Sequence, residues 1–191
     1  MAEDKYKYDL GTIHGRFQIL HNDHLKFLMA GKELCEHLIV GITNPDPSLT
    51  KDHDSNPHRS KPIANPLTFY ERYVMIRDNL LESELNYSEF SIVPFPINVP
   101  ELLKFYVPMN VVFFLSIYDD WGRQKKKYLE SQRLKVHVLW DVPLEKKGLS
   151  GSDIRESMLK GEPWKQFVPS ATTKLVQEWG IIKRLKDLNS E

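Results

Sequence analysis

Two histidines stand three positions apart just after a short turn that contains glycine and arginine. An extended apolar run over residues 8–13 leads into this turn, and a helical pattern begins beside His21 and His24. The first N–H groups of a helix lack intrahelical partners and lie at the positive end of its dipole, so this order of elements favours a phosphate site. Imidazoles three residues apart share one side of the first helical turn. The stretch therefore predicts two hydrogen-bond donors and Arg16 beside a phosphate.

A second stretch with related chemistry covers residues 148–155. Ser150 or Ser152 can cap a helix that begins near Asp153, because a serine hydroxyl accepts a hydrogen bond from the first helical turn. Hydroxyls, free N–H groups and the Arg155 guanidinium would then face one anion. The alternative is an ordinary capped helix at the surface.

Three motifs, in order along nearly the whole chain, resemble those of a known family. Residues 15–18 and the two histidines are similar to a G-R-F-Q-P-x-H-x-G-H signature. Residues 65–72 are similar to N-P-F-T-x-x-E-R, and residues 149–164 contain a close match to S-G-T-x-I-R-x-x-M. The chain thus resembles the nucleotidylyltransferase superfamily, most closely the archaeal-type nicotinamide-mononucleotide adenylyltransferases.

The resemblance implies that an acceptor phosphate oxygen attacks the α-phosphorus of a nucleoside triphosphate and pyrophosphate leaves. Such an acceptor is already ionised, so catalysis consists of positioning and charge neutralisation rather than general-base chemistry. Mg²⁺ would be held mainly by the triphosphate, with no metal site on the protein. The implied catalytic residues are His21, His24, Arg16 and Arg155. The implied nucleotide-binding residues are Gly15, Phe17, Gln18, Ser150, Gly151, Ser152 and Ile154.

A small phosphorylated acceptor is expected to contact two further segments. On a helix predicted over residues 67–81, a threonine and an arginine lie four residues apart, off the apolar stripe, where they can face the sheet edge. A solvated face is the alternative there. In the loop over residues 116–127, aromatic rings could stack on the acceptor and basic side chains could reach its phosphate. The predicted acceptor-binding residues are Thr68, Arg72, Tyr118, Trp121, Arg123 and Lys126.

Several positions depart from the family pattern. Ile19 replaces a proline, and Asp23 replaces the glycine before the second histidine. That glycine lets a base or backbone approach closely, whereas a carboxylate repels a triphosphate unless it meets magnesium or a hydroxyl, or caps the helix. Residues 98–106 lack the tryptophan that the adenylyltransferases usually place against nicotinamide. Residues 116–127 replace a short asparagine-containing loop.

Three functions are compatible with these observations. The first is an adenylyltransferase that makes NAD from ATP and nicotinamide mononucleotide. The second is a CTP-using relative that acts on another phosphate or phosphonate acceptor, which the departures favour. The third is a nucleotide-binding sensor or assembly subunit without turnover, against which the intact His21, His24 and Arg155 argue.

Strand-like and helix-like patterns alternate through the chain. Strands are predicted over residues 8–13, 37–43, 89–95, 110–115 and 134–140, and helices over 23–36, 67–81, 99–106, 123–131, from about 153, 169–179 and 181–188. This alternation of strands and helices indicates an α/β fold: a Rossmann-like, doubly wound sheet of five parallel strands with a C-terminal helical segment. Ligands bind at the carboxyl ends of such strands, where both motifs fall. The apolar residues of 44–66 recur with neither helical nor strand spacing, which predicts a mobile loop there. The whole chain, residues 1–191, is expected to form one domain.

Composition limits the classes of partner. The chain has 26 basic and 26 acidic residues, so no overall field favours nucleic acid or an anionic membrane surface. No apolar run approaches the roughly 20 residues of a membrane-spanning helix, and the N-terminus has no apolar signal segment. The single cysteine, Cys35, is expected to be a small buried residue within the first helix, which excludes an intrachain disulfide. We therefore expect a cytoplasmic protein without nucleic-acid or membrane partners. The resemblance is also compatible with a homo-oligomer, since related enzymes often form one.

Overall fold

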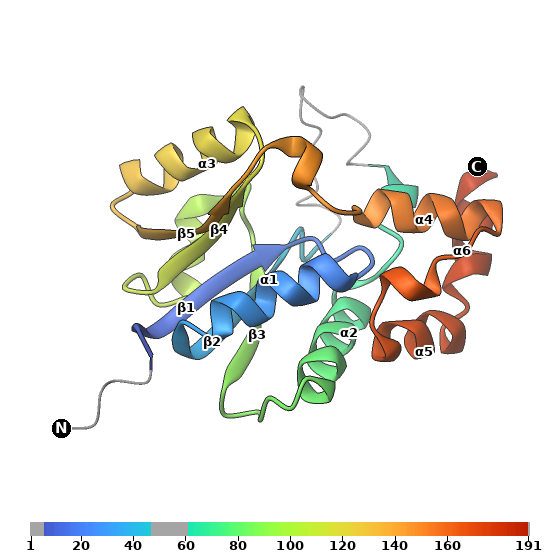
Figure 1. Ribbon diagram of the computed structural model, residues 1–191, viewed down its shortest axis with the longest axis horizontal. Coiled ribbons are helices and arrows are strands. Elements are labelled where there is room, and N and C mark those ends of the chain that lie inside the picture. The colour runs from blue at the N-terminus through green and yellow to red at the C-terminus, as the bar shows by residue number, and fades with distance from the viewer. Residues whose placement is uncertain (1–5, 47–60, 191) are drawn as a thin grey trace.

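The computed structural model describes residues 6–46 and 61–190. Its centre is one sheet of five parallel strands in the order β3-β2-β1-β4-β5 (Figure 1). The strands are β1 (Tyr8–Gly15), β2 (Cys35–Thr43), β3 (Phe90–Phe95), β4 (Val112–Ile117) and β5 (Lys135–Asp141). The strand order reverses between β1 and β4, which leaves a crevice at their carboxyl ends. The predicted Rossmann-like, doubly wound parallel sheet is confirmed.

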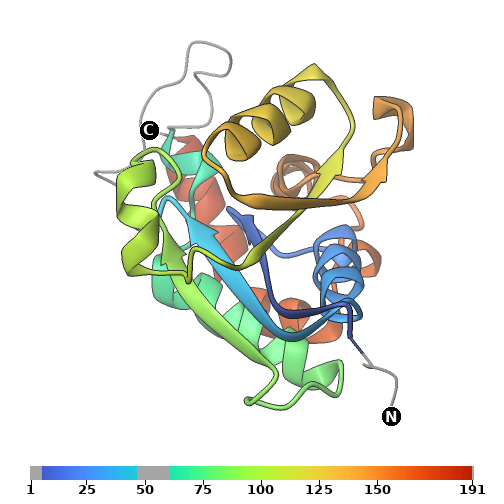
Figure 2. The same cartoon turned by 90° about the vertical axis from the view of Figure 1, so that its left-hand side faces the viewer.

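Helices cover both faces of this sheet. The α-helices are α1 (Asn22–Lys32), α2 (Phe69–Glu82), α3 (Asp120–Ser131), α4 (Gly151–Lys160), α5 (Ser170–Glu178) and α6 (Ile181–Asn189). Short 3₁₀ turns are η3 (Pro62–Ala64), η4 (Pro100–Phe105), η5 (Leu144–Lys146) and η6 (Lys165–Phe167). The larger core packs α1, α2 and the C-terminal helices on one face, and a smaller core packs η4 and α3 on the other (Figure 2). The C-terminal helical segment was predicted, including its break at Gly180, which has φ 62°.

Two elements differ from the sequence prediction. The first helix ends at Lys32, and Cys35 begins β2 instead of continuing that helix. Register explains this difference, because Cys35 pairs with Tyr8 of β1, and local apolar spacing does not report such long-range pairing. Cys35 is buried as expected, and burial raises the pKa of its thiol to about 11. Residues 99–106 form the 3₁₀ turn η4 rather than an α-helix.

The loop predicted over residues 44–66 is described only at its two ends. Residues 47–60 lie outside the described part of the chain, whereas residues 62–64 form η3 beside the carboxyl edge of the sheet. Within the described ranges, no helix has both the length and the apolar character needed to cross a membrane.

Candidate active site

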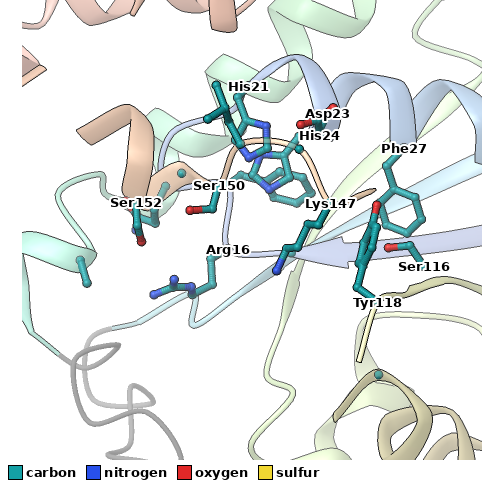
Figure 3. A pocket seen from close by; sticks show the side chains of 18 of the residues that line it. Arg16, His21, Asp23, His24, Phe27, Ser116, Tyr118, Lys147, Ser150 and Ser152 are labelled. Carbon is teal, nitrogen blue, oxygen red and sulfur yellow. The ribbon is translucent and has the colours of Figure 1, made fainter. Parts of the chain in front are cut away.

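A cavity of about 780 Å³ opens at the carboxyl ends of β1 and β4. Its walls come from the β1–α1 turn, the N-terminal parts of α1, α3 and α4, and the segment before α4 (Figure 3). Twelve of the residues predicted for the site line it. They are Gly15, Arg16, Phe17, Gln18, His21, His24, Tyr118, Trp121, Ser150, Gly151, Ser152 and Arg155.

The β1–α1 turn is held in place by buried groups. Phe17 is 1% exposed, has φ 51°, and packs its ring against His24 at 5.1 Å. The amide of Gln18 donates to the carbonyl of Leu67 at 2.9 Å and accepts from the Leu67 N–H at 2.8 Å. These two hydrogen bonds tie the turn to the segment that leads into α2. The Gln18 side chain therefore positions the turn.

The two histidines lie against one another at the N-terminus of α1. Their ring centroids are 3.8 Å apart, and both Nδ1 atoms are buried without a hydrogen-bond partner among the described residues. Burial lowers the pKa of His21 to about 4, against the opposing effect of Asp23 and Asp153. Burial, followed by the neighbouring His21, also lowers the pKa of His24 well below its usual value. Both rings are therefore neutral near pH 7.

The second motif begins α4 as its sequence predicts. Ser150 is the N-cap, and its hydroxyl and Asp153 form a capping box. Arg155 is 7% exposed; its guanidinium donates to the hydroxyl of Ser152 at 3.0 Å and to the backbone carbonyl of Gln18. Burial lowers the pKa of Arg155 to about 10, so it stays a cation at neutral pH. Arg155 thus joins the two motifs.

The start of α4 and the β1–α1 turn approach each other closely at Gly151. A Cβ on Gly151 would lie 2.9 Å from the carbonyl oxygen of Gln18. Only glycine leaves room there without a shift of one segment. The neighbouring Ile154, predicted for nucleotide binding, is 1% exposed and packs in the core without lining the cavity.

Four of the predicted acceptor residues lie outside the cavity lining. Thr68 caps α2, and its capping-box partner Glu71 forms an ion pair with Arg184. Arg72 is 2% exposed and donates to the backbone carbonyls of Arg16, Thr43, Asn44 and Thr68. Its hydrogen bonds hold the ends of β1 and β2 together.

The other two, Arg123 and Lys126, lie on α3. Arg123 forms an ion pair with Asp141 at 2.7 Å, and Lys126 forms one with Glu130 at 2.7 Å. Neither side chain lines the cavity. Tyr118 and Trp121 do line the cavity. Of the acceptor residues predicted in this loop, the aromatic ones therefore lie at the cavity and the basic ones do not.

The prediction that Asp23 could cap α1 is wrong. His21 is the N-cap residue, with no side-chain capping bond, and Asp23 is the second residue of the helix. The Asp23 carboxylate lies against Gly148, where an added Cβ would stand 2.0 Å from its Oδ2. It therefore borders the cavity beside the segment leading into α4.

Several lining residues were missed from the sequence. Lys147 lies 5.7 Å over the ring of Tyr118, and Figure 3 shows its amino group directed into the cavity. Its position just before the second motif was the available signal. Phe27 and Trp140 form an edge-on aromatic pair at 5.5 Å, but their sequence context indicated only helix and strand interiors.

His14 is a further residue that the sequence did not single out. Its ring stacks on Phe95 at 4.5 Å, and both ring nitrogens are buried without a partner among the described residues. Burial, followed by Lys125, lowers the pKa of His14 well below its usual value. The ring therefore behaves as an uncharged aromatic group at the end of β1.

Two helix N-termini beside paired histidines on a doubly wound sheet form a site suited to the phosphates of a nucleotide. Comparisons with known proteins agree. The model of the family described as cytidylyltransferase-like matches residues 12–157. Phosphonoformate cytidylyltransferase of Streptomyces viridochromogenes is 43% identical over 179 residues, covering 92% of this chain and 95% of that relative.

More distant likenesses point the same way. Nicotinamide-nucleotide adenylyltransferase of Thermococcus kodakarensis is 28% identical over 179 residues, covering 93% of this chain and 87% of that relative. A solved structure of a bifunctional NMN adenylyltransferase/ADP ribose pyrophosphatase from Francisella tularensis has a TM-score of 0.67 at 18% identity; the match covers 96% of this chain and 54% of that one. This structural likeness supports the fold alone. The chain belongs to the cytidylyltransferase-like family and is a nucleotidyltransferase.

Proposed function

We propose that this enzyme transfers CMP from CTP to a phosphonate or phosphate oxygen of a small acceptor and releases pyrophosphate. The observation that carries this proposal is the 43% identity to a phosphonoformate cytidylyltransferase over 92% of the chain. Identity to the Thermococcus kodakarensis nicotinamide-nucleotide adenylyltransferase over a similar span is 28%. Adenylyl transfer to nicotinamide mononucleotide, the first expectation from the sequence, is therefore the weaker alternative.

Residues along the cavity supply the donors that this reaction needs. Arg16, Lys147 and Arg155 carry positive charge, and Ser150 and Ser152 stand at the N-terminus of α4. Anions bind at such a terminus because its N–H groups and dipole both favour negative charge. We assign the triphosphate to this end of the cavity.

Chemistry takes place at the α-phosphorus. An ionised acceptor oxygen forms a bond to this atom, the bond to the oxygen bridging the α- and β-phosphorus breaks, and its electron pair leaves with pyrophosphate. His21 and His24 would donate hydrogen bonds to the phosphate oxygens on which charge gathers. Preorganised donors of this kind stabilise the transition state more than the ground state.

The acceptor end also supports a substrate other than nicotinamide mononucleotide. None of residues 98–106 lines the cavity; Phe105 is 72% exposed and Leu103 is buried in the smaller core. A stacking surface would come instead from Tyr118 and Trp121. A phosphonate such as phosphonoformate has no aromatic ring and needs hydrogen-bond donors rather than a stacking tryptophan.

Magnesium fits this site as an ion that arrives with the substrate. In the described part of the chain, no three His, Cys, Asp or Glu side chains form a cluster that could hold a metal. Mg²⁺ usually keeps several waters and takes most other ligands from phosphates. When bound, it would neutralise triphosphate oxygens.

A panel of donors and acceptors tests the proposal. Pyrophosphate release would be measured with CTP or ATP in magnesium, each with phosphonoformate, another small phosphonate, or nicotinamide mononucleotide. We expect release with CTP and a phosphonate. Release that requires ATP together with nicotinamide mononucleotide would overturn the proposal in favour of the adenylyltransferase.

A further inference from the structure

Asp23 is an acidic residue facing a cavity whose other polar side chains are mostly hydrogen-bond donors. The two other acidic side chains in the lining have partners: Asp119 accepts the N–H of Gly122, and Glu156 pairs with Lys160. Within the described ranges, the Asp23 carboxylate makes no hydrogen bond or ion pair. It is therefore an acceptor available to a ligand.

The two ends of the cavity differ in chemistry. One end carries Arg16, Ser150 and Ser152, and the other carries aromatic rings, as Figure 3 shows. Phe27 lies one helical turn after Asp23 and contacts Trp140, whose indole N–H donates to the hydroxyl of Tyr118 at 2.6 Å. Residues four apart on a helix lie on the same side, so Asp23 borders the aromatic end.

Gly148 makes room for this carboxylate. A Cβ at this position would stand 2.0 Å from Oδ2 and 2.7 Å from Cγ of Asp23. Gly148 does not adopt a positive φ, so its backbone does not itself require glycine. A side chain at position 148 would therefore displace the Asp23 carboxylate.

A carboxylate near a triphosphate is repulsive unless a hydrogen-bond donor meets it. The nucleoside part of the substrate offers two neutral donors, the exocyclic amino group of the base and the hydroxyls of the sugar. Aromatic walls suit a planar base or a sugar edge rather than phosphates. Asp23 borders these aromatic walls, so a neutral donor of the nucleoside can meet its carboxylate.

We propose that the Asp23 carboxylate accepts a hydrogen bond from the nucleoside of the bound triphosphate and thereby selects the donor substrate. The inference rests on the proposed function only in that this cavity binds a nucleoside triphosphate. Gly148 has a positioning role, since it leaves the space in which the carboxylate points at its ligand.

The test compares selectivity between donors rather than activity alone. Pyrophosphate release would give kcat/KM for CTP, UTP and 2′-deoxy-CTP in the native enzyme, Asp23→Ala and Gly148→Ala. UTP replaces the amino group with an acceptor oxygen, and 2′-deoxy-CTP removes one hydroxyl. Asp120→Ala is the matched control, because this carboxylate is 96% exposed and lies outside the cavity lining.

We expect the native enzyme to prefer CTP over one of the two analogues by about 10- to 100-fold, the range of a charge-assisted hydrogen bond. Asp23→Ala and Gly148→Ala should both reduce that preference at least tenfold, and Asp120→Ala should keep it. Loss of the CTP/UTP preference identifies the amino group, and loss of the CTP/2′-deoxy-CTP preference identifies the sugar hydroxyl. Unchanged ratios for both analogues in Asp23→Ala would overturn the inference, even if all three rates changed together.

Failure of the proposed function would be seen separately. If ATP rather than CTP supports turnover, the same ratios are measured with ATP, ITP and 2′-deoxy-ATP. If none supports turnover, calorimetric affinities for these triphosphates give the ratios without chemistry. The role of Asp23 is thus tested in each case by its effect on selectivity.

Discussion

His24 lies where a neutral imidazole can donate to a phosphate oxygen of the bound triphosphate. Its ring packs between Phe17 and His21, so its direction is fixed before substrate arrives. Removing one preorganised donor typically lowers the rate by about 10²- to 10³-fold. We expect a loss of this size in kcat for His24→Ala, measured by pyrophosphate release with the active donor and acceptor.

His37→Ala is the control for the loss of a histidine, because His37 bonds Ser88 and Ser91 away from the cavity. It should keep its turnover. An unchanged kcat in His24→Ala would remove His24 from the catalytic machinery.

The lowered pKa of His21 also makes stability depend on pH. Because burial lowers this pKa from 6.5 to about 4, the unfolded chain binds a proton that the folded chain does not bind between these values. The free energy of unfolding should therefore fall as pH falls from about 6.5 to 4, and His21 alone contributes about 3 kcal/mol to this loss. His14 and His24 shift in the same direction.

Urea unfolding at several pH values measures this effect. His21→Asn should lose less stability than the native chain between pH 6.5 and 4.5. Equal losses in the two proteins would mean that the pKa of His21 does not differ between the folded and unfolded states.

Helix α4 must approach the β1–α1 turn closely. The Cβ of Gly151→Ala would stand 2.9 Å from the Gln18 carbonyl and would separate the two segments that Arg155 joins. Since displacements near 1 Å are costly in such sites, we expect kcat/KM to fall on the order of 10- to 100-fold.

Ser157→Ala on the same helix serves as the control, since this side chain lies outside the cavity lining. Activity assays and thermal unfolding of both variants would be compared. Native kcat/KM in Gly151→Ala would show that the close approach is dispensable.

Arg72 connects α2 to the ends of β1 and β2. Arg72→Met leaves the carbonyls of Thr43, Asn44 and Arg16 without this donor in a buried place. Buried unpaired polar groups are costly, so the free energy of unfolding should fall by about 2–4 kcal/mol. Denaturant unfolding measures this change.

Arg77→Met provides a control on the same helix, because Arg77 pairs with its neighbour Asp78 at a partly exposed position. The sequence alone suggested that Arg72 binds the acceptor. A native free energy of unfolding together with a raised acceptor KM in Arg72→Met would favour that role over the structural one.

Over the whole molecule, the sequence predicted the elements that local patterns determine. Alternating apolar runs and helical periods gave five strands and the parallel sheet, and cap chemistry gave Ser150 as the start of α4. Cys35 was misplaced because strand pairing with Tyr8 ended the preceding helix early. Local periodicity contains no information about such pairing.

The site was predicted unevenly for the same reason. Each motif keeps its functional residues within a few positions, so the first brings His21 and His24 to the cavity and the second brings Ser150 and Arg155. The side chains of Arg72 and Gln18 bond backbone carbonyls that lie far away along the chain. Local sequence patterns do not reveal such long-range hydrogen bonds. Phe27 and Trp140 could be recognised as lining residues only once α1 and β5 were placed side by side.

Cytidylyl transfer to a phosphonate can be tested in one competition experiment. Equal concentrations of CTP and ATP would be incubated with the enzyme, magnesium, phosphonoformate and nicotinamide mononucleotide, and the products identified by mass spectrometry. We predict a CMP adduct of the phosphonate as the main product. NAD as the main product would exclude cytidylyl transfer as the main activity and identify the enzyme as a nicotinamide-nucleotide adenylyltransferase.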